Sequence, residues 1–560
     1  MMMKTIMTIL LTAGFSLAGS SEVSQFRKFV DEIVDTVALF DPVWATGAGM
    51  HDKDSLMPDY SAENILKHKA IVQAELDSLL TYDTAGWSSD DQIDYRKEVA
   101  ELKSLLFDDN DLSESQISMS FYFSAIYSGL YNLLISGELP FIEKSKAFRE
   151  RMTAIPDYLN RAKGNVKIIV IEDYSCASFM GVFANNLMEN FTQVMIDSLP
   201  SLNAEISTER DKAIWAIQSL LDEFRNELTL TYPQNLWDNR QEMEHILEDY
   251  FFVDFDLDSL QVILESEYAY ADSMYHYYDS QYYIDTTDNR SDNDWPEMSS
   301  IDEIDKYYQA EIDTIKKFLI DNDIMTVPDN FPVPRLAEYP EYLTYGDQYR
   351  TCVILPAFYD KNQTATFYID KELKRSFKYN RVFYKYPFRQ ALIENIIPGN
   401  YLQNYLSYRQ KSLPRAVSDN SIAMISWSLY IKEYMYQSGI LGDDPELLAQ
   451  LYSEIRDYEM AAIIELGMNL GKYGFTGAYN YVEQQYGEDE AKEFSRTSHC
   501  TCLNPTYSLA GALGRYLIRD MREKARAKEG RKFSIRHFHD RILAEGDVPL
   551  MLIAWKYGWQ

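Results

Sequence analysis

The apolar residues at the start of the chain recur every three or four positions, and this spacing constrains the fold more than any other feature. Between residues 26 and 40 they are Phe26, Phe29, Val30, Ile33, Val34, Val37, Leu39 and Phe40. Such spacing lays one apolar stripe along an α-helix. The periodicity returns over most of the 560 residues, which include only 23 Gly and 18 Pro. Because turn-rich sandwiches and barrels need many such residues, the chain is predicted to be all-α.

Two segments interrupt the helical pattern. Residues 286–299 are rich in Asp, Asn and Ser, which is typical of a loop. This loop is the predicted boundary between two lobes, at about 21–290 and 300–560, of a single helical domain. Residues 351–355 and 365–369 follow a cluster of prolines and have the composition of short strands, so we expect a small β-element near 351–370.

The charge balance excludes one class of function. The chain has 53 Lys and Arg against 87 Asp and Glu, a formal net charge of −34. Binding to nucleic acid by bulk electrostatics requires a basic surface, so no nucleic-acid partner is expected. The same balance argues against docking on anionic lipid. Four cysteines are too few for a disulfide scaffold.

The N-terminus has the pattern of a secretory signal peptide over residues 1–20. Lys4 precedes a short apolar run to residue 18, and small residues follow. The run is too short for a good membrane-spanning helix, and no later stretch is apolar enough to span a membrane. Residues 17–20 resemble a bacterial lipobox, with Ser20 where the lipidated cysteine belongs. We therefore expect cleavage and export to the periplasm or the medium, without a lipid anchor.

Three stretches are similar to segments of the bacterial DUF885 family, whose members resemble helical zinc peptidases. They are residues 41–61, 149–162 and 533–550. Their order and spacing hold from about residue 24 to 555. The resemblance implies a zincin-like, two-lobed helical fold with a deep cleft. Residues 388–412 and 421–437 are expected on the cleft floor, with 505–522 opposite and the β-element at the rim.

The family's chemical centre is H-E-A-I-P-G-H-H-L-Q on one helix and E-G-W-A-L-Y on a later one. The resemblance implies that the two His and the later Glu bind zinc, and that the Glu after the first His activates zinc-bound water. The corresponding residues here are 394–403 and 425–430. The scaffold of both motifs is retained, namely Pro398, Gly399, Leu402, Gln403, Trp427, Leu429 and Tyr430.

The four positions that carry the chemistry are changed. Glu394 stands at the first ligand position and still has a metal-binding side chain. Asn395 stands at the base position, where an amide cannot take a proton at neutral pH. Asn400 and Ile425 stand at the other two ligand positions. The Asn400 amide is a poor zinc ligand, and the Ile425 side chain has no ligand atom. We therefore expect no zinc cofactor and no metal site.

The resemblance assigns further residues to the cleft. Ser508 takes the position of a family Tyr that would polarise the substrate carbonyl, and Tyr507 lies one residue away. Tyr401, Tyr507, Arg519 and His539 are predicted to line a ligand-binding cleft. His539 either stabilises a tetrahedral intermediate, as the family implies, or is hydrogen-bonded within the helix packing.

Two functions follow as hypotheses. The first is a catalytically inactive peptidase homologue that keeps the cleft and binds a peptide or small molecule in it. The second is an active metal-dependent peptidase whose site is rebuilt from Glu394, His539 and another acidic side chain. The first predicts no stoichiometric zinc. The second predicts metal-dependent cleavage that Glu394→Gln abolishes.

Overall fold

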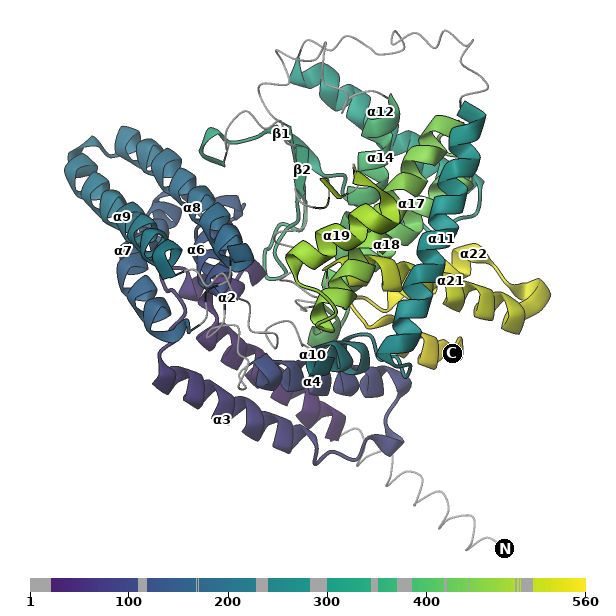
Figure 1. Ribbon diagram of the computed structural model, residues 1–560, viewed down its shortest axis with the longest axis horizontal. Helices are drawn as coiled ribbons and strands as arrows, with labels where there is room; N and C mark the ends of the chain where they lie inside the picture. Colours follow the sequence, from purple (N-terminus) through teal and green to yellow (C-terminus); the bar gives the residue numbers. More distant parts are fainter. Residues whose placement is uncertain are drawn as a thin grey trace, which may run out of the picture.

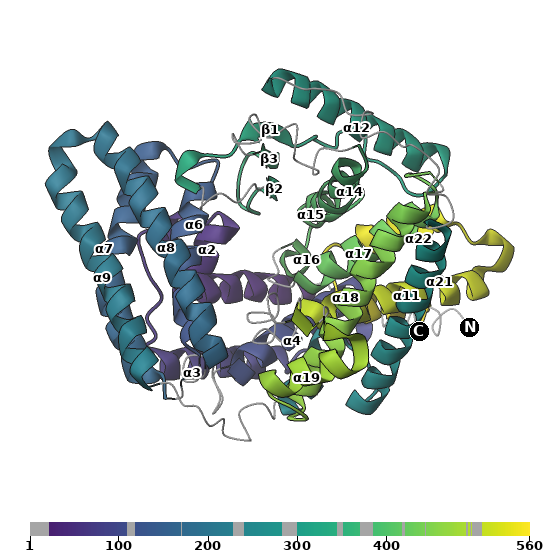
Figure 2. The same ribbon diagram turned by 45° about the horizontal axis from the view of Figure 1, so that its top comes forward.

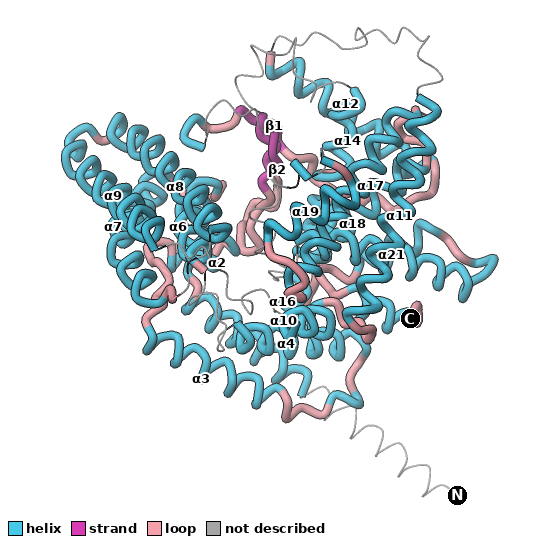
Figure 3. Tube along the Cα trace, in the orientation of Figure 1, coloured by secondary structure: helices cyan, strands magenta, loops and turns pink. Residues whose placement is uncertain are grey.

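The computed structural model describes residues 22–108, 118–167, 169, 171–227, 240–282, 300–343, 351–369, 385–416, 421–442, 444–488, 491–492, 494 and 507–560. The predicted signal peptide, the loop over 286–299 and the last two cysteines lie outside these ranges. The described chain is mainly helical with one small sheet, as Figure 3 shows. The prediction of an all-α fold with a small β-element is therefore confirmed. No described helix is long and apolar enough to cross a membrane.

A first group of helices packs around its own apolar core, on the left of Figure 1. Its helices are α6 (Met119–Ile135), α7 (Phe141–Asn165), α8 (Ile171–Ser198) and α9 (Asn203–Glu227). Fully buried side chains such as Phe123, Phe148 and Ile217 come from successive helices of this group. Asp173 accepts hydrogen bonds from the Met119 and Ser120 amides, so a buried carboxylate fixes the start of α6.

A second, larger core gathers most of the remaining helices, on the right of Figure 1. They are α10 (Arg240–His245), α11 (Leu257–Tyr282), α12 (Ile301–Asp321), α14 (Lys385–Asn395), α15 (Asn400–Ser407), α17 (Ser421–Gln437), α18 (Pro445–Asn469), α21 (Tyr507–Glu529), α22 (Ile535–Ala544) and α23 (Leu550–Tyr557). The short helices α16 (Leu413–Ala416) and α19 (Phe475–Tyr486) lie against the same body. A buried ion pair joins Arg515 of α21 to Glu267 of α11.

The boundary between the two cores falls before the loop over 286–299. Residues of α11 such as Leu260 and Leu264 are fully buried in the larger core, although they precede the loop over 286–299. The first group ends at Glu227, the end of α9. The lobe limits of about 290 and 300 stay a prediction, and the boundary between the cores follows packing partners and not loop composition.

The small sheet lies between the two cores (Figure 2). Its order is β1-β3-β2, with β3 (Thr366–Ile369) parallel to β1 (Arg335–Glu338) and antiparallel to β2 (Thr351–Ile354). Successive side chains of a strand point to opposite faces. Phe367 and Ile369 therefore belong to the larger core, whereas Tyr368 packs against the first core. The expected strands near 351–355 and 365–369 are present, and β1 was not anticipated.

The N-terminal helices run beneath both cores, at the bottom of Figure 1. A helix over residues 22–40 packs with α3 (Ala62–Leu79) and α4 (Ser89–Asp108) around Phe26 and Leu79. Ile93 of α4 is buried in the larger core. The short helix α2 (Pro42–Ala48) follows the first of these helices, packs against α6 and forms part of the site below.

Candidate functional site

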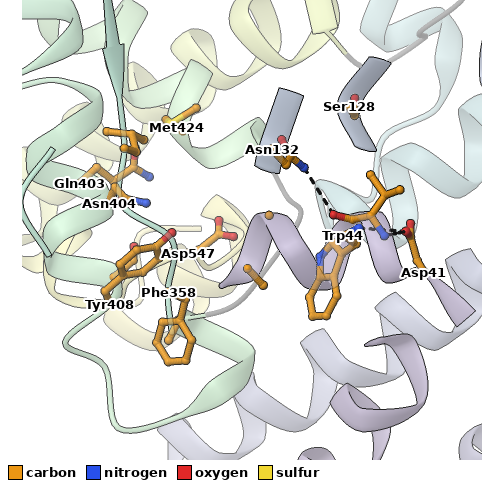
Figure 4. Close-up of a pocket in the computed structure, with 16 residues that line it drawn as sticks. Asp41, Trp44, Ser128, Asn132, Phe358, Gln403, Asn404, Tyr408, Met424 and Asp547 are labelled. Atoms are coloured by element: carbon orange, nitrogen blue, oxygen red, sulfur yellow. Dashed lines mark hydrogen bonds between the residues drawn. The ribbon is translucent and has the colours of Figure 1, made fainter. Parts of the chain in front are cut away.

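A pocket of about 510 Å³ lies between the two helical groups. Trp44 of α2 and Ser128 and Asn132 of α6 line one side. On the other side, in Figure 4, are Gln403, Asn404, Tyr408, Met424 and Asp547. The volume falls within the range of sites that bind small molecules. Apolar and amide groups make up most of its walls.

Arg151 of α7 holds the α2 wall of the pocket in place. Its side chain is fully buried and donates hydrogen bonds to the Leu56, Gly129 and Pro42 carbonyls and to the Thr46 hydroxyl. The side chain thus joins the segments 41–61 and 149–162 that carry the family resemblance. Burial lowers the pKa of Arg151 to about 10, which leaves the guanidinium charged at neutral pH.

The C-terminal motif places Asp547 in the pocket. Gly546 has a φ of 77°, and a Cβ there would lie 2.9 Å from the Arg415 carbonyl. The Asp547 amide donates to the same carbonyl at 3.0 Å. Arg415 is itself buried between Glu545 and Asp94 of α4. The glycine of the closing motif is therefore required by a close backbone approach beside the pocket.

Helix α15 presents a polar stripe to the pocket. Asn400, Gln403, Asn404 and Ser407 recur at intervals of three and four residues, which places them on one face. The last three line the pocket. The turn before this helix requires Gly399, because a Cβ there would lie 1.8 Å from the Glu394 carbonyl oxygen. The retained Pro398–Gly399 pair thus serves the entry into α15, and Trp427 Nε1 donates to the Pro398 carbonyl at 2.8 Å.

Glu394, at the first ligand position, is bound to a lysine. Lys432 Nζ lies 2.9 Å from Glu394 Oε2 and 2.7 Å from both carboxylate oxygens of Glu454. The Lys432 side chain is 7% exposed, whereas those of the two glutamates are 35% and 40% exposed. The neighbouring carboxylates outweigh the effect of burial and raise the pKa of Lys432. A charged ammonium therefore neutralises the carboxylate that a metal would need.

The other three altered positions offer no metal ligand set. Asn395 Nδ2 donates to the Ala391 carbonyl of its own helix at 3.0 Å. Ile425 packs against Gly511 of α21, because a Cβ added at Gly511 would lie 3.5 Å from Ile425 Cγ2. Asn400 contributes only an amide, whose oxygen is buried without a partner. Within the described ranges, no group of three His, Cys, Asp or Glu is arranged to hold a metal ion. These residues do not fit the zinc that the family resemblance implies.

Ser508 lies in the first turn of α21 and is hydrogen-bonded to a buried carboxylate. Its amide donates to Glu465 Oε2 at 3.2 Å, and its hydroxyl also bonds that carboxylate. Glu465 is fully buried, and burial raises its pKa to about 8. Tyr507 begins α21, and its side chain lies outside the described part of the structure.

His539 is held within the helix packing and is fully buried. One ring nitrogen is 2.9 Å from the Tyr430 hydroxyl and the other is 2.8 Å from the Ile324 carbonyl. Burial lowers the pKa of His539 to about 3, so the ring is neutral. Tyr430 precedes Lys432 by two residues, about 200° around the helix, so α17 separates His539 from Glu394.

The remaining predicted cleft residues also lie away from the pocket. Tyr401 is fully buried, and its hydroxyl donates to the Gln363 carbonyl. Arg519 lines a separate cavity of about 70 Å³ and pairs with Glu267 of α11. Helix α21 does not face α17 across a cleft, because Ser426 donates to the Ala510 carbonyl. The wall opposite α15 is formed by α2 and α6.

The comparisons with known proteins identify the family. The family model described as "Bacterial protein of unknown function (DUF885)" matches residues 42–556. The chain belongs to the DUF885 family. No curated protein matches the chain.

Two solved structures share the fold of this DUF885 protein. One is a putative lipoprotein of unknown function from Shewanella oneidensis, with a TM-score of 0.72, 20% identity, and coverage of 94% of this chain and 98% of that chain. The other is a putative lipoprotein from Colwellia psychrerythraea, with a TM-score of 0.72, 15% identity, and coverage of 96% and 98%.

The pocket residues of α2, α6 and residue 547 were not anticipated from the sequence. One signal could have found part of the site. In α15 the polar residues have helical spacing, and they alternate with the buried apolar residues Tyr401, Leu402 and Tyr405. Such a polar stripe is unusual for a helix within a core. No pattern in the sequence indicates that Asn132 and Trp44 line the pocket, because their position there depends on how the two cores pack together.

Proposed function

We propose that this DUF885 protein is an exported, catalytically inactive relative of metallopeptidases that binds a small molecule or short peptide between its two helical groups. The main support for this proposal is the ion pair between the Lys432 ammonium and the Glu394 carboxylate. A metal-dependent hydrolase needs a Lewis acid with an open position and a base to activate water. Here the remaining acidic side chain is neutralised, and Asn395 replaces the base.

The pocket supports the binding part of the proposal. It is concave, has a volume typical of small-molecule sites, and lies beside the retained residue Gln403 of the family motif. Two amide oxygens at its wall, on Gln403 and Asn404, are buried without a hydrogen-bond partner. A buried acceptor without a partner costs free energy, so a ligand that donates hydrogen bonds to these oxygens would be bound more tightly.

Two observations support export. The first 20 residues have the composition of a signal peptide. The two solved structures with the same fold are described as putative lipoproteins. The serine at position 20 favours release as a protein without a lipid anchor.

A peptide digest tests the inactivity. The mature chain is incubated with a mixed peptide library and zinc, and the products are identified by mass spectrometry. The proposal predicts no cleavage above a sample containing a metal chelator. Zinc-dependent cleavage by the wild type that Glu394→Gln abolishes, while Asp254→Asn on the surface retains it, would support the rebuilt-site alternative instead.

A further inference from the structure

The charged side chains that line the pocket have one sign. None of the 16 residues that line it, all in the described part of the chain, is Lys, Arg or His. Two are aspartates, Asp41 and Asp547. Asp41 Oδ1 accepts hydrogen bonds from the Val43 and Trp44 amides, so this carboxylate caps α2. Asp547 is the carboxylate that faces the pocket, and Figure 4 shows it directed toward α2.

The groups behind Asp547 do not reverse this sign. Lys97 is buried and pairs with Glu101, and its charge also interacts with Glu98 and Asp547. Burial and the charge of Glu101 raise the pKa of Glu98 well above its usual value. Without counting Glu98, the carboxylates of Glu101 and Asp547 outnumber the Lys97 ammonium by two to one.

The neutral groups of the pocket favour a ligand that donates hydrogen bonds. The Gln403 and Asn404 amide oxygens accept and have no partner, and Gln403 is only 7% exposed. The aromatic rings of Trp44, Phe358 and Tyr408 line the same space. Aromatic faces attract cations through the ring quadrupole. A carboxylate, unpaired acceptors and aromatic rings together match an ammonium group attached to an apolar body.

We propose that the inter-lobe pocket takes a ligand with a protonated amine, bound by Asp547 and the α15 amide oxygens, with its apolar part against Trp44. This inference rests on the proposed binding function and names the chemical class of its ligand. The pocket disfavours carboxylate and phosphate ligands, because no cationic side chain lines it to offset their desolvation.

Three matched probes test the charge preference. Tyramine, tyrosol and 4-hydroxyphenylacetate carry the same phenol ring with an ammonium, a hydroxyl and a carboxylate head. Their affinities for the full mature chain are measured by isothermal titration calorimetry at neutral pH. Tyramine is expected to bind at least about tenfold more tightly than tyrosol, a difference of about 1.4 kcal/mol, with 4-hydroxyphenylacetate weakest.

Variants assign the binding to the pocket. Asp547→Asn should remove most of the tyramine preference, and Asn404→Asp in that background should restore part of it. Trp44→Ala should weaken all three probes because it removes the shared apolar contact. Asp254→Asn, an exposed carboxylate outside the pocket, is the matched control. The unfolding temperature of each variant is also measured, to detect a folding defect in Asp547→Asn. Recovery of tyramine binding when Asn404→Asp is added would show that Asp547→Asn lost a charge and not its fold.

The outcomes separate the two proposals. Tyramine selectivity that falls in Asp547→Asn and remains in Asp254→Asn supports the inference. If tyrosol or 4-hydroxyphenylacetate binds as tightly as tyramine and Trp44→Ala weakens it, the amine inference is wrong and the binding function stands. If none of the probes binds the wild type, the amine inference is wrong, whereas the proposed function is judged by the peptide digest.

Discussion

Lys432 Nζ and Glu394 Oε2 form an ion pair of 2.9 Å at the position that the family resemblance assigns to a first metal ligand. Glu454 of α18 completes the cluster on the other side of the ammonium. One buried cation thus satisfies two carboxylates that would otherwise repel each other. The ion pairs with Lys432 give Glu394 a structural role that requires no metal.

Removing this cation should destabilise the fold. Lys432→Met leaves Glu394 and Glu454 facing each other, and both carboxylates are more than a third exposed, so water screens part of the repulsion. We expect the free energy of unfolding to fall by about 1–2 kcal/mol, measured by urea titration. Lys306→Met, on the exposed face of α12, is the control. Equal effects of the two substitutions would argue against a structural role for Lys432.

The turn between α14 and α15 should not accept a side chain at position 399. Gly399→Ala places a Cβ 1.8 Å from a backbone carbonyl oxygen, which cannot move like a flexible side chain. The expected loss is at least about 3 kcal/mol of unfolding free energy or failure to fold. Gly137→Ala has open space around its Cβ and should fold normally. A folded Gly399→Ala protein of wild-type stability would contradict the described turn.

The α2 wall depends on Arg151. Arg151→Met leaves three backbone carbonyls without their donor, and the expected loss of unfolding free energy is about 3–5 kcal/mol. Because α2 lines the pocket, binding of the tyramine probe should weaken even under conditions where the variant remains folded. The exposed Arg531→Met serves as the control. Unchanged stability would show that other contacts hold α2 in place.

His51 should make stability depend on alkaline pH. Asp360 and Asp54 raise its pKa from 6.5 to about 9. A raised folded-state pKa stabilises the fold fully below the unfolded value of 6.5, and the contribution is lost as the pH rises through about 9. The stability difference between wild type and His51→Gln should therefore shrink between pH 6 and pH 10 in thermal unfolding experiments. The control is His537→Gln, at an exposed position. A constant difference for His51→Gln would disprove the ion pairs.

The sequence predicted the helical class because apolar periodicity depends only on neighbouring residues. It also located the strands near 351 and 366, where β-branched and aromatic residues follow prolines. The place of α11 in the larger core could not be predicted, because it depends on distant partners such as Arg515.

The candidate site was predicted only in part, for the same reason. The altered motif positions were recognised from retained neighbours such as Gly399 and Trp427. However, Lys432 lies outside the motif, and its contact with Glu394 requires α14 and α17 to pack together. His539 lies two residues from His537, yet only the packing shows that it faces Tyr430 and not Glu394.

The zinc content of the protein shows whether the altered motif can still hold a metal. The protein is loaded with zinc, dialysed, and measured by inductively coupled plasma mass spectrometry. We expect less than about a tenth of an equivalent of zinc per chain, because Lys432 neutralises Glu394 and the other ligand positions hold Asn400 and Ile425. Close to one equivalent in the wild type, lost in Glu394→Gln and retained in Asp254→Asn, would contradict this expectation.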